Sequence, residues 1–333
     1  MRFAALSLAL AAAGCAPYAD FKLPPPAGDR REVSWQWKPH TGPVLPRGSD
    51  GEWDGVDTLN PSVVWWKDRL LNFYSGFDGK TWRTGLAEST DGYHWRKLGS
   101  LLTPDGWEGS YIAANGHALP RGGEILLWYQ AGDPPRIALA RWSGKGMPVK
   151  HPAAVLEPGP RGSWDERGVA DPYVLEAGGA LYMFYLGQDR ARRQRLGVAR
   201  SKDGAHWVKL KSNPILELGG VGEFDEKGLG EPAVWSQFGA YWMLYTGRDR
   251  GERRRMGLAK SRDGVRWEKL SSPIIAGHEP WNEKVVCDAT VLLDGETVRV
   301  WYGGGDTPRP DERLNGQIGY GVLVPVGVKL AGE

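Results

Sequence analysis

The sequence of 333 residues has little cysteine and almost no net charge. Two cysteines cannot supply a disulfide scaffold, which needs several pairs. A net charge of +2 argues against a nucleic-acid partner, because affinity for nucleic acids comes largely from neutralised phosphates. No His/Cys cluster has the spacing of a zinc site, and the chain lacks a P-loop and a dinucleotide-binding motif. We expect neither a metal nor a cofactor; a central Ca²⁺ or halide is compatible with the fold proposed below, but no motif specifies one.

Turn-forming and aromatic residues are abundant. The chain contains 47 Gly and 24 Pro, with 17 Trp and 12 Tyr. The large aromatics supply the apolar area that a folded core needs, which excludes a disordered chain. This composition predicts a turn-rich, all-β protein.

The N-terminus contains a single long apolar run, Phe3–Ala13, which is typical of a secretory signal and too short to span a membrane. The segment Ala12–Cys15 (AAGC) resembles the lipobox of bacterial lipoproteins, which implies that Cys15 is lipidated. We expect a signal peptide over 1–14 and an extended tether over 15–32. This places the protein at the bacterial cell envelope, anchored by lipid; release into the periplasm or medium after ordinary signal cleavage is the alternative.

Short patterns recur along the rest of the chain. Three segments, beginning at Ser89, Ser201 and Ser261, share Ser-x-Asp-Gly-x-x-Trp, and Asp-Gly between alternating runs predicts a tight hairpin. An apolar strand that ends in Tyr occurs five times, at Tyr74, Tyr129, Tyr185, Tyr245 and Tyr302. Fourteen residues before each tyrosine lies a polar residue, which we call the axial residue: Asn60, Asn115, Asp171, Glu231 and Asp288.

The axial residues are 55, 56, 60 and 57 residues apart. Five such units of about four short strands predict a five-bladed β-propeller. The fifth unit lacks its last strand, and Ser34–Leu45 resembles the fourth-strand segment His206–Leu216. We therefore expect an N-terminal strand to close the last blade and cover its open edge. The predicted propeller spans 33–327 with a tail over 328–333, as a monomer; a two-layer β-sandwich is the alternative.

The first strand of a propeller blade is innermost, so the axial residues should ring one end of the central channel. The loops between second and third strands emerge at the same end, and they are rich in arginine, including Arg190, Arg192 and Arg250. Arginine recognises carboxylate, sulfate or phosphate through its planar fork. These loops predict an anionic glycan or phosphate ligand; a salt-bridged rim is the alternative, because acidic residues are interleaved.

The motifs GVADPYV around Asp171 and GLGEPAVW around Glu231 resemble those of the five-bladed propeller glycoside hydrolases of families 43, 32 and 130. The resemblance implies a carbohydrate substrate, with Glu231 as general acid and Asp171 as the residue that orients and tunes it. An ionised Asp171 nearby would favour the protonated form of Glu231.

Blade one departs from the family pattern, because Asn60 stands where the hydrolases carry an aspartate base. An amide is no effective base, so four outcomes are open for the site, and an Asn60 that hydrogen-bonds a substrate hydroxyl fits all of them. Asp57 could supply the second carboxylate, or Asp288 could supply it from blade five. Phosphate could replace water as nucleophile, as in family 130 phosphorylases, or the site could bind a glycan without cleaving it.

Two further residues are candidates for substrate contact. His117 lies two positions after Asn115, and alternation along a strand would point both to the same side. Trp53 could stack on a sugar ring; the alternative is that the Trp-Asp pairs pack between blades. The function expected overall is glycoside hydrolysis.

Overall fold

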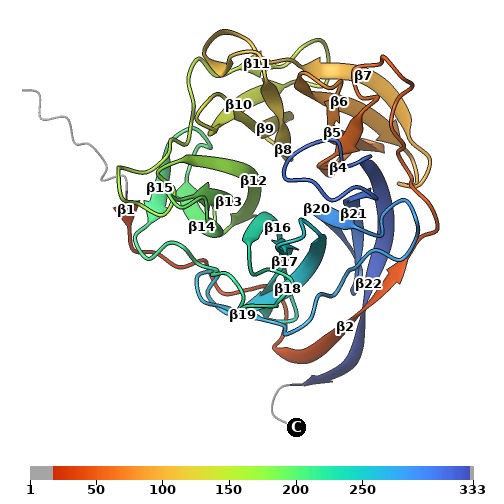
Figure 1. Cartoon of the computed structure of the whole chain (residues 1–333). Coiled ribbons are helices and arrows are strands. Elements are labelled where there is room, and N and C mark those ends of the chain that lie inside the picture. The colour runs from red at the N-terminus through yellow and green to blue at the C-terminus, as the bar shows by residue number, and fades with distance from the viewer. Residues whose placement is uncertain (1–17, 331–333) are drawn as a thin grey trace, which may run out of the picture.

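The computed structural model describes residues 18–330, which form five antiparallel sheets arranged radially around a central axis (Figure 1). The first strands of neighbouring sheets contact one another in a closed ring, so each sheet is one blade. The predicted all-β, five-bladed propeller is confirmed. Within residues 18–330 there is no α-helix, and no helix there could cross a membrane.

The strands follow the predicted units. Blade one contains β3 (Asp57–Leu59), β4 (Val63–Trp66), β5 (Arg69–Phe77), β6 (Trp82–Ser89) and β7 (Arg96–Leu102), followed by the 3-10 turn η1 (Gly106–Glu108). Blade two contains β8 (Ile112–Arg121), β9 (Glu124–Ala131), β10 (Arg136–Trp142) and β11 (Val149–Lys150). Blade three contains β12 (Gly168–Ala177), β13 (Ala180–Gln188), β14 (Gln194–Ser201) and β15 (Trp207–Leu210). Blade four contains β16 (Gly228–Gln237), β17 (Ala240–Arg248), β18 (Arg254–Ser261) and β19 (Trp267–Lys269). Blade five contains β20 (Val285–Asp294), β21 (Thr297–Gly305), β22 (Gln317–Leu330) and the N-terminal strand β2 (Arg31–Pro39).

The ring closes through β2, which pairs antiparallel with β22 and so completes blade five. The predicted N-terminal closing strand is therefore confirmed. Before it, β1 (Tyr18–Ala19) adds a parallel strand to the outer edge of β15, and Leu23 is buried against Gly264. The signal segment and Cys15 lie outside the described residues, and the domain boundaries stay predictions.

Each blade is held by a buried tyrosine and an acidic or amide partner. In blade three, the carboxylate of Asp165 is fully buried and accepts hydrogen bonds from Tyr185 Oη at 3.3 Å and Lys209 Nζ at 2.5 Å. The equivalent sets are Tyr74–Asp54–Lys97, Tyr129–Glu108–Lys150, Tyr245–Asp225–Lys269 and Tyr302–Asn282. The repeated tyrosine is thus structural, which explains why it is constant while the axial residue varies.

The aromatic residue before each of these acidic or amide partners packs over a glycine; it is phenylalanine in blade four and tryptophan in the other blades. A Cβ on Gly187 would lie 2.3 Å from the ring of Trp164. We expect Gly187→Ala to lower the free energy of unfolding by about 1–3 kcal/mol, the usual cost of overpacking, as measured by urea denaturation. Gly220→Ala is the control, because its added methyl would meet no atom closer than 3.7 Å. Equal midpoints for the two variants would contradict this packing.

Candidate active site

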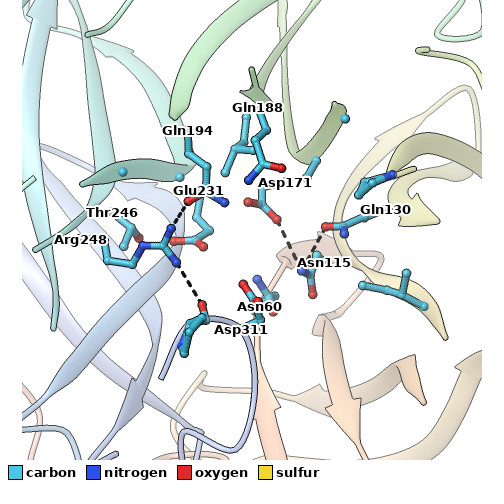
Figure 2. A pocket seen from close by; sticks show the side chains of 18 of the residues that line it. Asn60, Asn115, Gln130, Asp171, Gln188, Gln194, Glu231, Thr246, Arg248 and Asp311 are labelled. Atoms are coloured by element: carbon cyan, nitrogen blue, oxygen red, sulfur yellow. Dashed lines mark hydrogen bonds between the residues drawn. The ribbon is translucent and has the colours of Figure 1, made fainter. Parts of the chain in front are cut away.

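All five axial residues line one cavity of about 730 Å³. Figure 2 labels four of them, Asn60, Asn115, Asp171 and Glu231. All five also have a positive φ, between 46° and 58°. A residue other than glycine is uncommon in this region, and the strain costs on the order of 1 kcal/mol or more. The same unfavourable conformation in every blade indicates that the bend serves the site.

The sequence produces this bend through a β-bulge. In blade three the register of β12 against β13 shifts between Ala170 and Tyr173, so Asp171 and Pro172 stand outside the hydrogen-bonded ladder. Proline fits there because the position requires no N–H donor. Blades two, four and five shift at the same place. The bulge turns the axial side chain toward the cavity.

Three axial residues are carboxylic acids, and they share one buried environment. Burial raises the pKa of Asp171 well above its usual value, and the negative charges of Glu231 and Asp288 raise it further. Burial, with the charge of Glu231, raises the pKa of Asp288 to about 8. Three such acids carry fewer than three negative charges at neutral pH. The raised pKa of Asp171 opposes the ionised state that we expected for this residue from the sequence.

An amide network holds one side of the cluster (Figure 2). Asn115 Nδ2 donates to Asp171 Oδ1 at 3.5 Å and to Gln130 Oε1 at 3.4 Å. Ser75 Oγ donates to Asn115 Oδ1 at 3.1 Å. Asn115 therefore positions Asp171 while remaining part of the cavity wall.

Asp288 is fixed by its neighbours on the other side. Its Oδ2 accepts hydrogen bonds from Cys287 Sγ at 3.1 Å and from the backbone N–H of Asn60 at 3.4 Å. A Cβ on Gly303 would lie 2.8 Å from the same oxygen, so glycine is required for this close approach. Within residues 18–330, no three His, Cys, Asp or Glu side chains are grouped to hold a metal ion.

Asp57 does not reach the cavity. Its carboxylate is fully buried and accepts backbone N–H donors from Arg313 at 2.5 Å, Leu314 at 2.9 Å and Gly316 at 2.8 Å. Burial raises its pKa, although these three hydrogen bonds oppose the rise. The structure corrects the expectation that Asp57 could supply the second carboxylate, because its oxygens are occupied by the backbone of blade five.

His117 and Trp53 also lie outside the cavity wall. The Nδ1 of His117 accepts the backbone N–H of Val174 at 3.2 Å, and burial lowers the pKa of His117 to about 3. The expected alternation fails because the bulge at Asn115 shifts the register of β8. Trp53 packs against Tyr74, which agrees with the alternative that this residue has a packing role and does not stack on a sugar ring.

The arginines singled out from the sequence separate into two groups. Arg190 pairs with Glu166 at 3.0 Å and Arg250 pairs with Glu226 at 3.2 Å; neither arginine lines the cavity. These two form the salt-bridged rim that was the alternative. Arg192 does line the cavity, with an exposed side chain at its mouth.

Several cavity residues were missed from the sequence, and strand alternation could have found four of them. Side chains one and three positions after the constant tyrosine lie on the opposite face of the strand from it. These positions hold Gln130, Gln188, Thr246 and Arg248. Arg254, at the start of β18, also lines the cavity and is buried.

Comparisons with known proteins agree with this architecture. A β-1,2-mannobiose phosphorylase from Listeria innocua, solved with β-1,2-mannobiose, superposes with a TM-score of 0.65 at 13% identity, over 81% of this chain and 90% of the other. A thermostable family-43 glycoside hydrolase gives a TM-score of 0.65 at 17% identity, over 88% and 98%. At these identities the similarity shows the fold alone.

Curated relatives are closer in sequence. An uncharacterized protein of Mycobacterium tuberculosis is 28% identical over 62% of this chain and 75% of its own length. A 1,2-β-oligomannan phosphorylase of Thermoanaerobacter sp. is 29% identical over 34% of this chain and 41% of its own length. Residues 69–288, about two thirds of the sequence, match the model of the glycosyl hydrolases family 32 N-terminal domain. The chain therefore belongs to the family that is defined by the N-terminal domain of the glycosyl hydrolases of family 32. This family is one of the five-bladed propeller families of enzymes that act on glycans.

Proposed function

We propose that the protein cleaves glycosidic bonds by hydrolysis, with Glu231 as proton donor and Asp288 as the second carboxylate. The observation that carries this proposal is the state of Glu231 in the cavity. Its Oε2 is buried and has no hydrogen-bond partner among the described residues. A buried carboxyl group without an internal partner is available to a substrate oxygen.

The chemistry follows from the positions of the three acids. Breaking a glycosidic bond requires one carboxylic acid to protonate the leaving oxygen and a second carboxylate to activate water or attack the anomeric carbon. In this proposal Glu231 gives its proton to the leaving group. Asp288 takes the role that blade one lacks, in its ionised form, which becomes more abundant as the pH rises toward its pKa of about 8. Asp171, which Asn115 positions through a hydrogen bond, is the third acid beside Glu231, and Asn60 and Asn115 offer amide groups to sugar hydroxyls.

Phosphorolysis is a second candidate, favoured by the arginines of the cavity. Arg192, Arg248 and Arg254 all line it, and guanidinium groups bind phosphate in a bidentate manner. Phosphate that attacks the anomeric carbon needs no base to deprotonate it, which is compatible with Asn60. The partial similarity to a 1,2-β-oligomannan phosphorylase supports the same candidate. The same arginines favour a glycan that carries an anionic group.

A substrate screen tests these proposals. Aryl glycosides and oligosaccharides, including β-1,2-mannobiose, are incubated with and without inorganic phosphate, and the products are separated by chromatography. We expect free reducing sugar in phosphate-free buffer. Turnover only with phosphate, giving sugar 1-phosphate, would replace hydrolysis by phosphorolysis. Binding without turnover across the panel would contradict both and support a glycan-binding protein.

We further propose that the protein is a lipoprotein of the bacterial cell envelope, anchored through Cys15. The apolar run Phe3–Ala13 and the lipobox-like AAGC sequence support this proposal. Metabolic labelling with a fatty acid, followed by membrane fractionation, tests it. Cys15→Ala should lose the label and leave the membrane fraction; label that persists would contradict the proposal.

A further inference from the structure

The loop over residues 306–316, between β21 and β22, forms one wall of the cavity. Pro310, Asp311 and Leu314 from this loop line it, and Figure 2 labels Asp311 at its edge, across from Asn115. The loop has no regular secondary structure, so side chains and backbone groups of other blades must hold it in place.

Asp57 of blade one holds the C-terminal half of this loop. Its two oxygens accept three backbone N–H groups, those of Arg313, Leu314 and Gly316. Two loop residues, Arg313 and Asn315, have a positive φ of 60° and 57°. Such conformations persist only when surrounding interactions fix them. The Asp57 carboxylate supplies these interactions from the protein interior.

The N-terminal half of the loop contacts the arginines of blade four. Arg254 Nη2 donates to the carbonyl oxygen of Arg309 at 3.0 Å and also to that of Pro310. Arg248 Nη1 donates to the carbonyl oxygen of Pro310 at 3.2 Å. The loop therefore connects Asp57 in blade one to the guanidinium group of Arg254.

Arg254 in turn lines the same cavity as the three acids of the site. Its acidic neighbours are Glu231 on β16, Asp288 on β20 and Asp311 on the loop itself. The thiol of Cys287 is also close, and burial raises the pKa of this thiol well above its usual value. Its positive charge opposes the burial that raises the pKa of Asp171 and of Asp288. The placement of Arg254 thus affects how readily the acid cluster ionises.

We propose that Asp57 is a positioning residue: it fixes the loop 306–316, and the loop carbonyls hold Arg254 in the wall of the cavity that Asp171, Glu231 and Asp288 also line. This assigns a role to Asp57, the blade-one acid three positions before Asn60, which occupies the position of the missing base. The inference deepens the proposed function, and it rests on that function in one point: the carboxyl cluster performs the cleavage.

The test uses carboxyl ¹³C NMR, which follows the acids of the cluster without requiring a substrate. Aspartate and glutamate are labelled in the full chain, and pH titrations compare wild type with Asp57→Asn, Arg254→Lys and the double variant. Asparagine at position 57 keeps the size of the side chain but has only one oxygen to accept the three N–H groups. Lysine at position 254 keeps the positive charge but lacks the planar guanidinium group that bonds the loop carbonyls. Each single variant should raise the apparent pKa of the cluster by less than about one pH unit, because the positive charge at position 254 is displaced and not removed, and the presence of a close opposite charge contributes about one to three units.

The double variant should show no further rise, because both changes act through the same contact. Asp225→Asn is the matched control: it removes another buried aspartate, bonded to Lys269, that does not line the cavity. It should leave the titration of the cluster unchanged. Additive shifts, an unchanged titration in Asp57→Asn, or an equal shift in the control would each overturn the proposal.

A second variant covers the case in which Asp57→Asn fails to fold. Replacing 309–312 by two glycines keeps Arg313, Leu314 and Gly316, whose N–H groups bond Asp57, and shortens the segment whose backbone carbonyls reach Arg254. It should raise the apparent pKa of the cluster as Arg254→Lys does, and an unchanged titration would overturn the proposal. The titration does not depend on turnover, so a failure of Glu231 as proton donor would appear in kinetics and leave this result intact.

Discussion

Glu231→Gln is expected to reduce the rate of glycoside cleavage by about 10²–10⁴-fold, the usual contribution of a general acid. Glutamine has nearly the same size and still lines the cavity, but it cannot give a proton to the leaving oxygen. Substrate binding should change little, so the loss should appear in kcat rather than in KM. Initial rates on the best substrate of the screen measure it.

The dependence of the cleavage rate on the leaving group distinguishes loss of the proton donor from a general disruption of the active site. The dinitrophenolate of a dinitrophenyl glycoside is a good leaving group that needs no protonation. Cleavage of this substrate should therefore be affected much less than cleavage of an unactivated disaccharide. Glu226→Gln is the control, because Glu226 lies in the same blade, pairs with Arg250 and does not line the cavity. It should keep wild-type rates. Equal losses on both substrates in the Glu231 variant would remove Glu231 as the proton donor.

Asp288→Asn is expected to raise the free energy of unfolding at pH 8 while it lowers the rate of cleavage. Burial and the charge of Glu231 raise the pKa of Asp288 to about 8 in the folded protein, whereas an unfolded aspartate titrates near 4. The folded state therefore holds the proton more tightly. Because of this difference, folding stability falls as the pH rises from about 4 to about 8.

The size of the effect follows from the same difference, at about 1.4 kcal/mol for each pKa unit. The gain from asparagine should therefore amount to several kcal/mol at pH 8 and be clearly smaller at pH 5, as measured by denaturant unfolding. Asp225→Asn should instead destabilise the protein, since it leaves Lys269 without its carboxylate partner. A gain for Asp288→Asn that is equal at both pH values would contradict the ionisation argument.

The fold could be predicted because its information is local and repeated. The Asp-Gly hairpins, the constant tyrosines and the fixed distance to each axial residue define five equivalent units. The closing strand could be predicted because the fifth unit visibly lacked one strand. The axial residues reach one cavity because a bulge recurs at the same register.

Residues outside this repeat could not be placed in the same way. Asp57 binds Arg313, 256 residues further along the chain, through an irregular loop that no periodicity describes. His117 was misplaced because strand alternation assumes an unbroken ladder, and the bulge at Asn115 breaks it. For Arg190 and Arg250, composition predicted charge near the mouth, but ion pairing with nearby glutamates depends on three-dimensional distances.

The pairing of β2 with β22 has a consequence for the newly made chain. Residues 31–39 emerge from the ribosome early, while their partner strand, 317–330, is among the last segments to be synthesised. Blade five cannot assemble until almost the whole polypeptide is available, because β2 is N-terminal and the other three strands of the blade are the last to be synthesised. During this interval β2 is an unpaired strand edge, which is a template for aggregation. Ring closure should therefore be a late event in biogenesis.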